Sequence, residues 1–315
     1  MSQMNAAVGA SVPENHTQPS GLSGFWSLIV TQFGGAFNDN ALKTLVTFFG
    51  LNLAISESLH QALVPLTAAL FSFPFILFSM LGGFLADRFS KRSITIAVKV
   101  LEIGIMSFAT LGLLLKNLPM GLAAIFLMGV HSAIFGPSKY GLLPELLPEK
   151  KLSWGNGVLE LGTFLAIIIG ISVGALLSKS LRGQEVWAGL VLIVLAIIGL
   201  GCSLGITRVP AADRQRAFEI NFLEGLWAQI QRMRQDRVLW LACLGNMYFW
   251  FIGQLLQQSV LDYGANVLKV DENHTAGLLA ALAIGIGIGS FAAGYLSGGK
   301  IEYGLVPLGS LGLCV

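Results

Sequence analysis

The sequence predicts an all-α integral membrane protein with about eight complete transmembrane helices and part of a ninth. Of its 315 residues, 54% are hydrophobic and only 11% are charged, and the mean hydropathy is +0.73. A soluble domain carries about 25% charged residues, and a chain this apolar cannot hide its surface from water in one core. The chain also contains long apolar runs separated by short polar stretches. This is typical of membrane-spanning helices, because a helix needs about 20 apolar residues to cross a bilayer.

These apolar runs give the order of the predicted helices. They lie at about residues 25–54, 62–86, 93–115, 119–143, 155–178, 185–207, 238–262 and 274–297, and a further run begins near residue 303. Residues 1–24 are polar and lack the charged and apolar regions of a signal peptide, so we expect a disordered cytoplasmic tail. The first membrane helix then directs insertion itself.

The distribution of Lys and Arg between the predicted loops gives the orientation. Basic residues concentrate in the loops after the second, fourth, sixth and eighth helices, whereas the opposite loops hold Lys116, Lys179, Arg182 and Lys269. Positively charged loops stay in the cytoplasm. We therefore expect a multi-pass protein with a cytoplasmic N-terminus.

The longest polar stretch, residues 209–237, divides the chain. It is basic, and its apolar residues recur at helical spacing opposite charged ones, which predicts an amphipathic linker helix on the cytoplasmic surface of the membrane. We expect an N-terminal six-helix bundle at 25–208 before it and an incomplete C-terminal bundle at 238–315 after it. Six helices before a linker is the arrangement of a transporter built from two six-helix halves, here truncated in the second half.

Polar residues interrupt the first predicted helix near its middle. In GGAFNDNALKTL, residues 34–45, the side chains of Asp39, Asn40 and Lys43 fall within one arc of the helix. Asp39 and Lys43 are four residues apart, the spacing at which an acid and a base on one helix meet. A charge at the bilayer centre costs roughly 2.5–3.5 kcal/mol, so we expect this stripe to face a polar cavity with its charges partly paired.

Three other predicted helices add polar residues to this cavity. Lys139 lies in the fourth helix, Asn156 and Glu160 lie in the fifth, and Gln257 lies in the seventh. The pair Gly136-Pro137 precedes Lys139, and we expect it to break the fourth helix so that freed backbone groups line the cavity. The expected cavity therefore carries both signs of charge and several amides.

Other polar residues in these helices have a simpler interpretation. Lys99 and Glu102 are three residues apart near the cytoplasmic end of the third helix, where they either form a structural pair or extend to the membrane surface. His131 stands alone in the fourth helix, and we expect a hydrogen-bonded packing residue. We include none of the three in the predicted cavity.

A motif follows the second predicted helix. The segment GFLADRFSKR places a small residue, an acid at the helix end and a basic turn in order, with Gly83, Asp87, Arg88, Lys91 and Arg92 as its members. We expect Gly83 to let two helices approach closely, and Asp87 to form a contact that breaks when the two halves of a transporter rock. The segment resembles the G-x-L-a-D-r-x-g-r-[kr] signature of the major facilitator superfamily, with Ser90 where that family usually has Gly. The resemblance implies a gating role.

Four further segments narrow the resemblance. FNDNALKT (37–44), FGPSKYGLLPELLP (135–148), NGVLELGT (156–163) and KIEYGLVPLG (300–309) resemble the lysophospholipid transporters of the bacterial inner membrane, a branch of this superfamily. The resemblance implies inward flipping of a lysophospholipid, chiefly lysophosphatidylethanolamine, by alternating access and for re-acylation on the cytoplasmic side. It also implies that acidic and basic cavity residues hold the zwitterionic head group.

The resemblance can be carried to single residues. Asp39 matches the acid in the first helix of this branch, and Lys139 matches the base in the fourth. Stand-alone members carry a further basic residue in the seventh helix, where this chain has Gln254, Gln257 and Gln258. In this respect the chain resembles relatives that are fused to an acyltransferase and an acyl-carrier-protein ligase. The missing basic residue leaves the head-group preference open.

The sequence predicts no catalytic residue, no cofactor and no metal site. None of His16, His60, His131 and His274 begins the H-x4-D pair of an acyltransferase, and GIGIGS at 285–290 lies inside a predicted helix instead of an adenylate-binding loop. The three cysteines form neither a disulfide framework nor a zinc site, and a net charge of +2 gives no case for nucleic acid. The expected partners are lysophospholipid, membrane lipid and, in a fused or associated form, an acyltransferase or acyl-carrier-protein ligase.

Two other functions stay open from the sequence. The first is export of drugs or metabolites by another kind of facilitator. The second is a non-transporting role as the membrane domain of a fused acyltransferase. Charges of both signs favour a zwitterionic or polar head group over an apolar drug. A pure anchor would have no reason to keep charges at mid-membrane depth.

Overall fold

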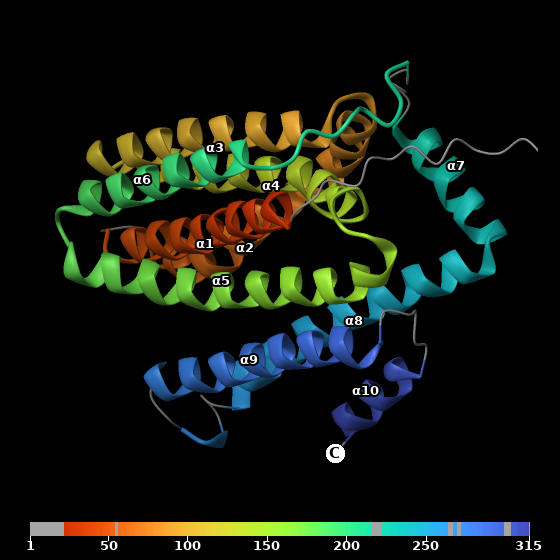
Figure 1. Cartoon of the computed structure of the whole chain (residues 1–315). Helices are drawn as coiled ribbons and strands as arrows, with labels where there is room; N and C mark the ends of the chain where they lie inside the picture. The colour runs from red at the N-terminus through yellow and green to blue at the C-terminus, as the bar shows by residue number, and fades with distance from the viewer. Residues whose placement is uncertain are drawn as a thin grey trace, which may run out of the picture.

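The computed structural model of this protein describes residues 22–53, 56–215, 222–263, 267–269, 272–298 and 304–314. The first long helices run side by side along a common direction (Figure 1). They are α1 (Ser23–Leu51), α2 (Glu57–Arg88), α3 (Lys91–Leu114), α4 (Leu118–Leu146), α5 (Leu152–Ser180) and α6 (Glu185–Leu204). A short 3₁₀ turn, η1 (Glu149–Lys151), leads directly into α5.

A second group of helices follows an extended connection. It comprises α7 (Phe222–Gln235), α8 (Arg237–Asp262), α9 (Glu272–Leu296) and α10 (Leu305–Cys314). Figure 1 shows α7 at one end of the molecule, at an angle to the other helices. α9 packs along α5, and α8 contacts both α7 and α9. Asp236 begins α8 as its N-cap, because its side-chain Oδ1 accepts the backbone N–H groups of Val238 and Leu239.

The helices occupy the apolar runs that the sequence predicts, with ends shifted by a few residues. Among the described residues, five helical segments are long and apolar enough to cross a membrane, namely α2, α3, α4, Glu149–Ser180 and α6. α1 is not among them, since polar side chains interrupt its middle. The predicted tail falls largely on residues 1–21, which lie outside the described residues.

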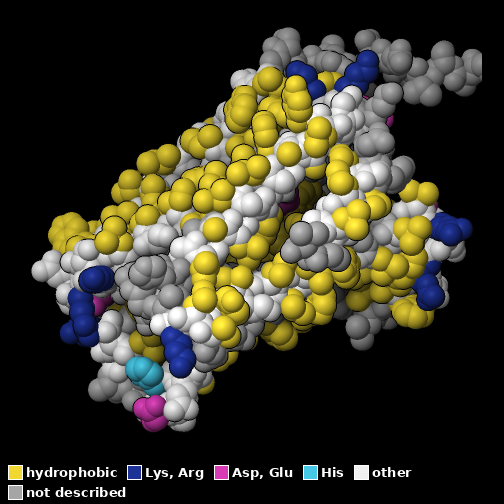
Figure 2. Space-filling model, turned by 90° about the horizontal axis from the view of Figure 1, so that it is seen from below, with side chains coloured by type: hydrophobic (Ala, Val, Ile, Leu, Met, Phe, Trp, Pro, Cys, Tyr) yellow, Lys and Arg dark blue, Asp and Glu magenta, His cyan; other side chains and the backbone are white. Residues whose placement is uncertain are grey.

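The surface of the molecule agrees with a membrane location. Figure 2 shows hydrophobic side chains along the length of one face, with Lys and Arg gathered toward the ends. Many large apolar side chains on α2 and α6 are exposed, among them Phe73, Ile76, Val194 and Ile198. Exposed apolar side chains in this number are costly in water, whereas they are favourable against lipid tails.

α1 lies at the centre of the first six helices. It packs against α4, α5 and α6, and its apolar side chains form the main buried core together with those of the neighbouring helices. A Cβ atom at Gly170 or Gly174 of α5 would lie 2.6 Å or 2.7 Å from a backbone carbonyl oxygen of α1. These glycines therefore let the two backbones approach closely, and the close contact keeps the polar middle of α1 inside the bundle.

α4 differs from the prediction because it is continuous. The expected break at Gly136 and Pro137 does not occur, and the helix continues through both positions. Proline has no backbone N–H, so it cannot donate a hydrogen bond to the carbonyl four residues earlier in the helix. For Pro137 this is the carbonyl of Ala133. That oxygen lies against Gly82 of α2, where a Cβ atom would be only 2.7 Å away. The freed carbonyl is thus covered by a neighbouring helix, and the frayed helix end expected at Lys139 was wrong.

Gly83 does not make the close helix contact that the sequence predicts for it. A Cβ atom at Gly83 would meet nothing within 4 Å, whereas one at Gly82 would lie against the carbonyl oxygen of Ala133. Adjacent residues point about 100° apart around a helix, and here Gly82 is the one that faces α4. The close approach of α2 and α4 therefore depends on Gly82, and the prediction for Gly83 was wrong.

Candidate functional site

Asp39 lies in the interior of the helix bundle, where α1 faces α4. Its carboxylate Oδ2 accepts a hydrogen bond of 2.7 Å from the hydroxyl of Ser132 in α4. The other oxygen, Oδ1, is buried and has no hydrogen-bond partner among the described residues. A buried carboxylate oxygen without a donor is costly, so a ligand that brings an N–H group to this position gains a favourable contact.

Asn40 and Lys43 continue the polar stripe of α1 but do not pair with Asp39. The Asn40 side chain donates to the carbonyl of Ala36 in its own helix at 2.8 Å. The Lys43 ammonium lies 4.3 Å from the centroid of the Phe71 ring in α2, a cation–π contact. Within the described part of the chain, no carboxylate oxygen lies within 4.0 Å of that ammonium. The expected Asp39–Lys43 pair is therefore replaced by a contact with α2.

A second charged group lies between α4 and α5. The Tyr140 hydroxyl donates to Oε1 of Glu160 at 2.9 Å, and the Lys139 ammonium lies 4.7 Å from the centroid of the Tyr140 ring. The Lys139 ammonium is attracted by the carboxylates of both Glu160 and Asp39. Oε2 of Glu160 is buried without a hydrogen-bond partner in the described structure. Lys139 therefore links the acid on α1 electrostatically to the acid on α5.

One of the two remaining predicted cavity residues, Asn156, lies apart from these contacts. Asn156 is exposed, and its amide donates to the carbonyl of Leu152 in its own helix at 3.0 Å. The side chain of Gln257 lies outside the described residues. Elsewhere in α8, Trp250 stacks on Phe164 of α5, with ring centroids 6.3 Å apart. This contact brings α8 against the helix that carries Glu160. Figure 2 shows a hollow near the middle of the molecule, with acidic side-chain atoms at its bottom.

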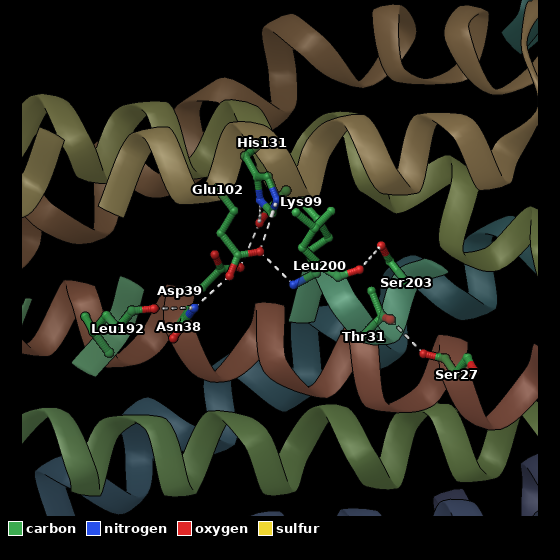
Figure 3. A network of polar contacts seen from close by, with 11 residues as sticks. Ser27, Thr31, Asn38, Asp39, Lys99, Glu102, His131, Leu192, Leu200 and Ser203 are labelled. Atoms are coloured by element: carbon green, nitrogen blue, oxygen red, sulfur yellow. Dashed lines mark hydrogen bonds and ion pairs between the residues drawn. The ribbon is translucent and has the colours of Figure 1, made fainter. Parts of the chain in front are cut away.

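Next to Asp39, Figure 3 shows a cluster formed by Asn38, Lys99, Glu102 and His131, which are buried and do not belong to the predicted cavity. The Lys99 ammonium lies 2.6 Å from Oε2 of Glu102, and both side chains are 0% exposed. Asn38 of α1 donates to Oε1 of Glu102 at 2.7 Å and to the carbonyl of Leu192 in α6 at 3.3 Å. His131 of α4 places Nε2 at 3.5 Å from Oε2 of Glu102. Helices α1, α3 and α4 thus meet at one carboxylate, and Asn38 links it to α6.

This cluster confirms one interpretation and extends another. Lys99 and Glu102 form the expected structural pair, and their burial excludes an extension to the membrane surface. His131 is buried as expected, but it is joined to Glu102 and does not stand alone. Asn38 and Ser132 were not predicted from the sequence as partners of the acids. Asn38 precedes Asp39 and Ser132 follows His131 in the sequence, and this proximity was the only available indication of their role. The pattern within one helix does not show which side chains meet across helices.

The motif between α2 and α3 ties several helix ends together. Lys91 forms an ion pair with Glu145 near the end of α4. Arg92 donates from Nη2 to the carbonyl of Leu204 at 2.9 Å and from Nε to the carbonyl of Ile206 at 2.6 Å. A helix C-terminus leaves its last carbonyl groups without intrahelical partners, so Arg92 acts as a side-chain cap for the end of α6.

The same motif also contacts the connection to α7. The backbone N–H of Asp213 donates to the carbonyl of Asp87 at 2.8 Å. The Arg88 guanidinium lies 5.6 Å from the centroid of the Phe84 ring and 5.9 Å from that of Phe89. The segment after α6 therefore touches the end of α2, and the ends of α2, α3, α4 and α6 form one connected region.

The described side chains suit non-covalent binding. Within the described ranges, no group of three or more His, Cys, Asp or Glu side chains is placed to hold a metal ion. Cys202 and Cys243 are free thiols. What the interior offers is a set of fixed charges, amides and hydroxyls, which is the chemistry of recognition of a charged polar group.

Comparisons with known proteins place this arrangement in a family. The sequence profile of the Major Facilitator Superfamily matches residues 25–315. The lysophospholipid transporter LplT of Salmonella arizonae is 30% identical over 285 residues, which cover 89% of this chain and 68% of the relative. The LplT protein of Klebsiella pneumoniae is 29% identical over 290 residues, with the same coverage.

Solved structures share the fold at low sequence identity. A POT family transporter crystallised with 5-aminolevulinic acid matches with a TM-score of 0.51 at 14% identity, over 81% of this chain and 55% of its own. The peptide transporter POT crystallised with sulfate gives a TM-score of 0.50 at 13% identity, over 82% of this chain and 55% of its own. The chain thus spans about two thirds of the length of these curated relatives and just over half of the solved chains.

The profile match extends over nearly the whole chain, and the similarity to LplT proteins covers 89% of it. The helices, the motif between α2 and α3 and the charged interior all lie within it. This chain therefore belongs to the Major Facilitator Superfamily and, within it, to the branch that contains the lysophospholipid transporters.

Proposed function

We propose that this chain is a transporter that moves a lysophospholipid of the lysophosphatidylethanolamine type across the bacterial inner membrane by alternating access. The observation that carries the proposal is the placement of both signs of charge in the interior, with Asp39 on α1, Lys139 on α4 and Glu160 on α5. A zwitterionic head group presents an ammonium and a phosphate, and such an interior binds both. The relatives named as lysophospholipid transporters support the same substrate class.

Each charged group has its own task in this proposal. Lys139 receives the phosphate, because a charge-assisted hydrogen bond to an ammonium is among the strongest available to it. The unpartnered Oδ1 of Asp39 accepts an N–H of the substrate ammonium. Glu160, oriented by the Tyr140 hydroxyl, attracts the Lys139 ammonium. We assign the other predicted polar residues to the same cavity, namely Asn40, Lys43, Asn156 and Gln257.

The proposed layout has two unequal halves. Residues 25–208 form the N-terminal six-helix bundle, residues 209–237 form an amphipathic linker at the cytoplasmic surface, and residues 238–315 form part of a second bundle. With residues 1–24 as a cytoplasmic tail, the chain has about eight complete membrane spans and part of a ninth. The excess of Lys and Arg in alternate loops supports this orientation, and the helix positions support the layout.

We assign a gating role to the motif Gly83, Asp87, Arg88, Lys91 and Arg92. It joins the ends of α2, α3, α4 and α6 and touches the segment that leads to α7. A rocking motion of one half against the other would have to break or carry these contacts. In this view the lipid arrives from the outer leaflet and leaves inside, where a separate or fused acyltransferase and its acyl-carrier-protein ligase restore the second acyl chain.

The proposal is tested in spheroplasts of a strain that lacks its own lysophospholipid transporter, with and without the full chain. Labelled lysophosphatidylethanolamine is added outside, and its conversion to diacyl lipid is followed. We expect faster conversion with the chain present. Permeabilised cells, in which the label reaches the inner face directly, must convert at the same rate in both strains. Equal conversion in intact spheroplasts, with the protein present in the membrane, would contradict the proposed substrate and leave a drug or metabolite exporter or a membrane anchor.

A further inference from the structure

Lys43 is a lysine inside the bundle whose ammonium has no close anionic partner. The ammonium lies 4.3 Å from the centroid of the Phe71 ring. Among the described residues, it donates no hydrogen bond and has no carboxylate oxygen within 4.0 Å. Lys43 is partly exposed, whereas Asp39, one turn earlier in α1, is only 8% exposed. An ammonium carries three N–H donors, so this group can still bind an anion.

Lys139 in α4 has similar surroundings. Its ammonium lies 4.7 Å from the centroid of the Tyr140 ring, and no carboxylate oxygen of the described residues lies within 4.0 Å of it. Cation–π contacts hold both ammonium groups in place without neutralising them. The carboxylate of Asp39 attracts Lys43. Lys139 is attracted by Glu160 and also by Asp39. Asp39 is thus the acid that the two lysines share.

α1 and α4 lie side by side in the bundle and run in opposite directions (Figure 1). Two contacts establish this arrangement. A Cβ atom at Gly121, near the start of α4, would lie 2.9 Å from Cγ1 of Val46, near the end of α1. Ser132, further along α4, donates to Asp39, which lies earlier in α1. Positions that follow Ser132 in α4 therefore lie at the level of positions that precede Asp39 in α1.

This arrangement places the two lysines on opposite sides of Asp39. An α-helix rises about 1.5 Å per residue. Lys43 lies four residues after Asp39, or about 6 Å toward the C-terminal end of α1. Lys139 follows Ser132 by seven residues, or about 10 Å in the opposite direction along the bundle. The backbone positions are therefore stacked in the order cation, acid and cation.

We propose that Lys43 is a second phosphate-binding position, at which the phosphate of the head group binds before it passes to Lys139, while the substrate ammonium stays at Asp39. The inference rests on the proposed function and deepens it, since it divides the recognition of one head group between two positions. In the proposed orientation, the C-terminal end of α1 faces the outer leaflet, so a lipid from that leaflet meets Lys43 first. A flexible two-carbon unit joins the ammonium to the phosphate, and rotation about its bonds turns the phosphate to either side of Asp39.

The charges favour this order of binding. A substrate ammonium at Asp39 neutralises the carboxylate that attracts Lys43, so the Lys43 ammonium then needs another anion. The substrate phosphate supplies that anion. Lys139 keeps the attraction of Glu160 and becomes the partner of the phosphate deeper in the bundle. The phosphate therefore has a cation on each side of Asp39, and it does not cross the interior as an unpaired charge, which is costly at this depth.

The first test measures uptake of labelled lysophosphatidylethanolamine, over a range of concentrations, by spheroplasts that lack their own lysophospholipid transporter and carry the full chain. We expect Lys43→Gln to raise KM at least about tenfold, because it removes the outer partner of the phosphate, and to leave the maximal rate within about twofold. Lys43→Arg, which keeps the charge, should restore most of the affinity. Phe71→Leu removes the ring but keeps the Lys43 ammonium, so it should change KM less than Lys43→Gln. Lys179→Gln, at an exposed position near the end of α5, is the matched control.

The second test measures binding to the purified full chain. Lys139→Ala, which should not transport, should still bind lysophosphatidylethanolamine through Lys43 and Asp39. The double variant Lys43→Gln/Lys139→Ala should bind this lipid at least about tenfold more weakly than Lys139→Ala does. Monoacylglycerol, which lacks the phosphate, should bind these two variants equally, because the phosphate is the group that Lys43 recognises.

The outcomes separate the inference from the proposed function. A raised KM in Lys43→Gln together with retained binding in Lys139→Ala supports the second phosphate position. An unchanged KM in Lys43→Gln, or equal binding by Lys139→Ala and the double variant, overturns it, while wild-type uptake keeps the proposed function in place. Equal effects of Lys43→Gln and Phe71→Leu would make Lys43 a packing residue and would also overturn it. A wild-type chain without uptake removes the proposed function, and the inference falls with it.

Discussion

The ammonium of Lys99 lies 2.6 Å from the carboxylate of Glu102, and both side chains are completely buried. Glycines on two helices make the space for it, since a Cβ atom at Gly35 of α1 or Gly199 of α6 would lie 3.2 Å from the Lys99 nitrogen. Asn38 and His131 bring α1 and α4 to the same carboxylate. The pair therefore connects the helices that surround Asp39, and we expect the packing of these helices to depend on it.

Removing one partner of this pair should destabilise the protein strongly. We expect Lys99→Met or Glu102→Leu alone to cost about 3–5 kcal/mol, because each leaves an uncompensated buried charge. The double variant, which removes both charges and keeps similar volumes, should recover most of that loss. The measurement is the thermal unfolding midpoint of purified protein in detergent, with Lys179→Met, at an exposed position near the end of α5, as the control. A double variant no more stable than the worse single variant would contradict this account.

The neighbouring glycines of α2 should respond differently to the same change. Gly82→Val should disrupt the contact between α2 and α4, because even a Cβ atom there would be 2.7 Å from the carbonyl oxygen of Ala133. Gly83→Val should be tolerated in the state described, since its Cβ atom would have open space. The amount of folded protein recovered from membranes by size-exclusion chromatography measures both. Equal recovery of the two variants would show that Gly82 is not the contact position.

Loss of the Arg92 cap should loosen the end of α6. Arg92→Ala removes donors to the carbonyls of Leu204 and Ile206, and hydrogen bonds from charged donors contribute about 1.5–3 kcal/mol each. Arg92→Lys should be intermediate, because one ammonium cannot reproduce the two directions of a guanidinium. Hydrogen exchange measured by mass spectrometry should show faster exchange at the C-terminal turn of α6 and in the adjoining segment. Unchanged protection in Arg92→Ala would argue against the cap.

Substitution of the interior charges should abolish transport without removing the protein from the membrane. Asp39→Asn takes away the negative charge that pairs with the substrate ammonium, and Lys139→Ala takes away the partner for its phosphate. We expect conversion of external lysophosphatidylethanolamine to fall to the level of spheroplasts without the chain. Lys179→Ala is the control for removal of a lysine, and Glu185→Gln, in the first turn of α6 and partly exposed, is the control for removal of an acid. Normal uptake in both interior variants would refute the site assignment.

A variant of the motif should affect the conformational cycle more than recognition. Asp87→Asn keeps the backbone carbonyl that accepts from Asp213 but removes the negative charge at the end of α2. We expect slower uptake with retained binding of lysophosphatidylethanolamine to the purified protein. Arg214→Gln, one residue beyond Asp213 and exposed, is the control in the same region. Loss of binding with an unchanged rate of uptake at saturating lipid would reverse the assignment.

The positions of the helices could be predicted from the sequence because crossing a bilayer imposes a length and an apolar composition on each segment by itself. The motif at 83–92 and the four similar segments likewise gave the family, which the profile match confirms. Asp39, Lys139 and Glu160 could be singled out for the same reason, since a charge inside an apolar run is costly wherever it lies. These properties belong to single segments, and a sequence displays them directly.

The contacts between segments depended on the tertiary structure. Asn38 meets Glu102, and Gln32 meets Thr163, across 64 and 131 positions of the chain, and no spacing rule within one helix specifies such pairs. Packing also overrode local preference at Pro137, where α2 covers the freed carbonyl and the helix continues. The sequence therefore determined which groups must avoid lipid. The arrangement of neighbouring helices decided which partner each group found, because that choice is made by distances of a few ångströms between helices.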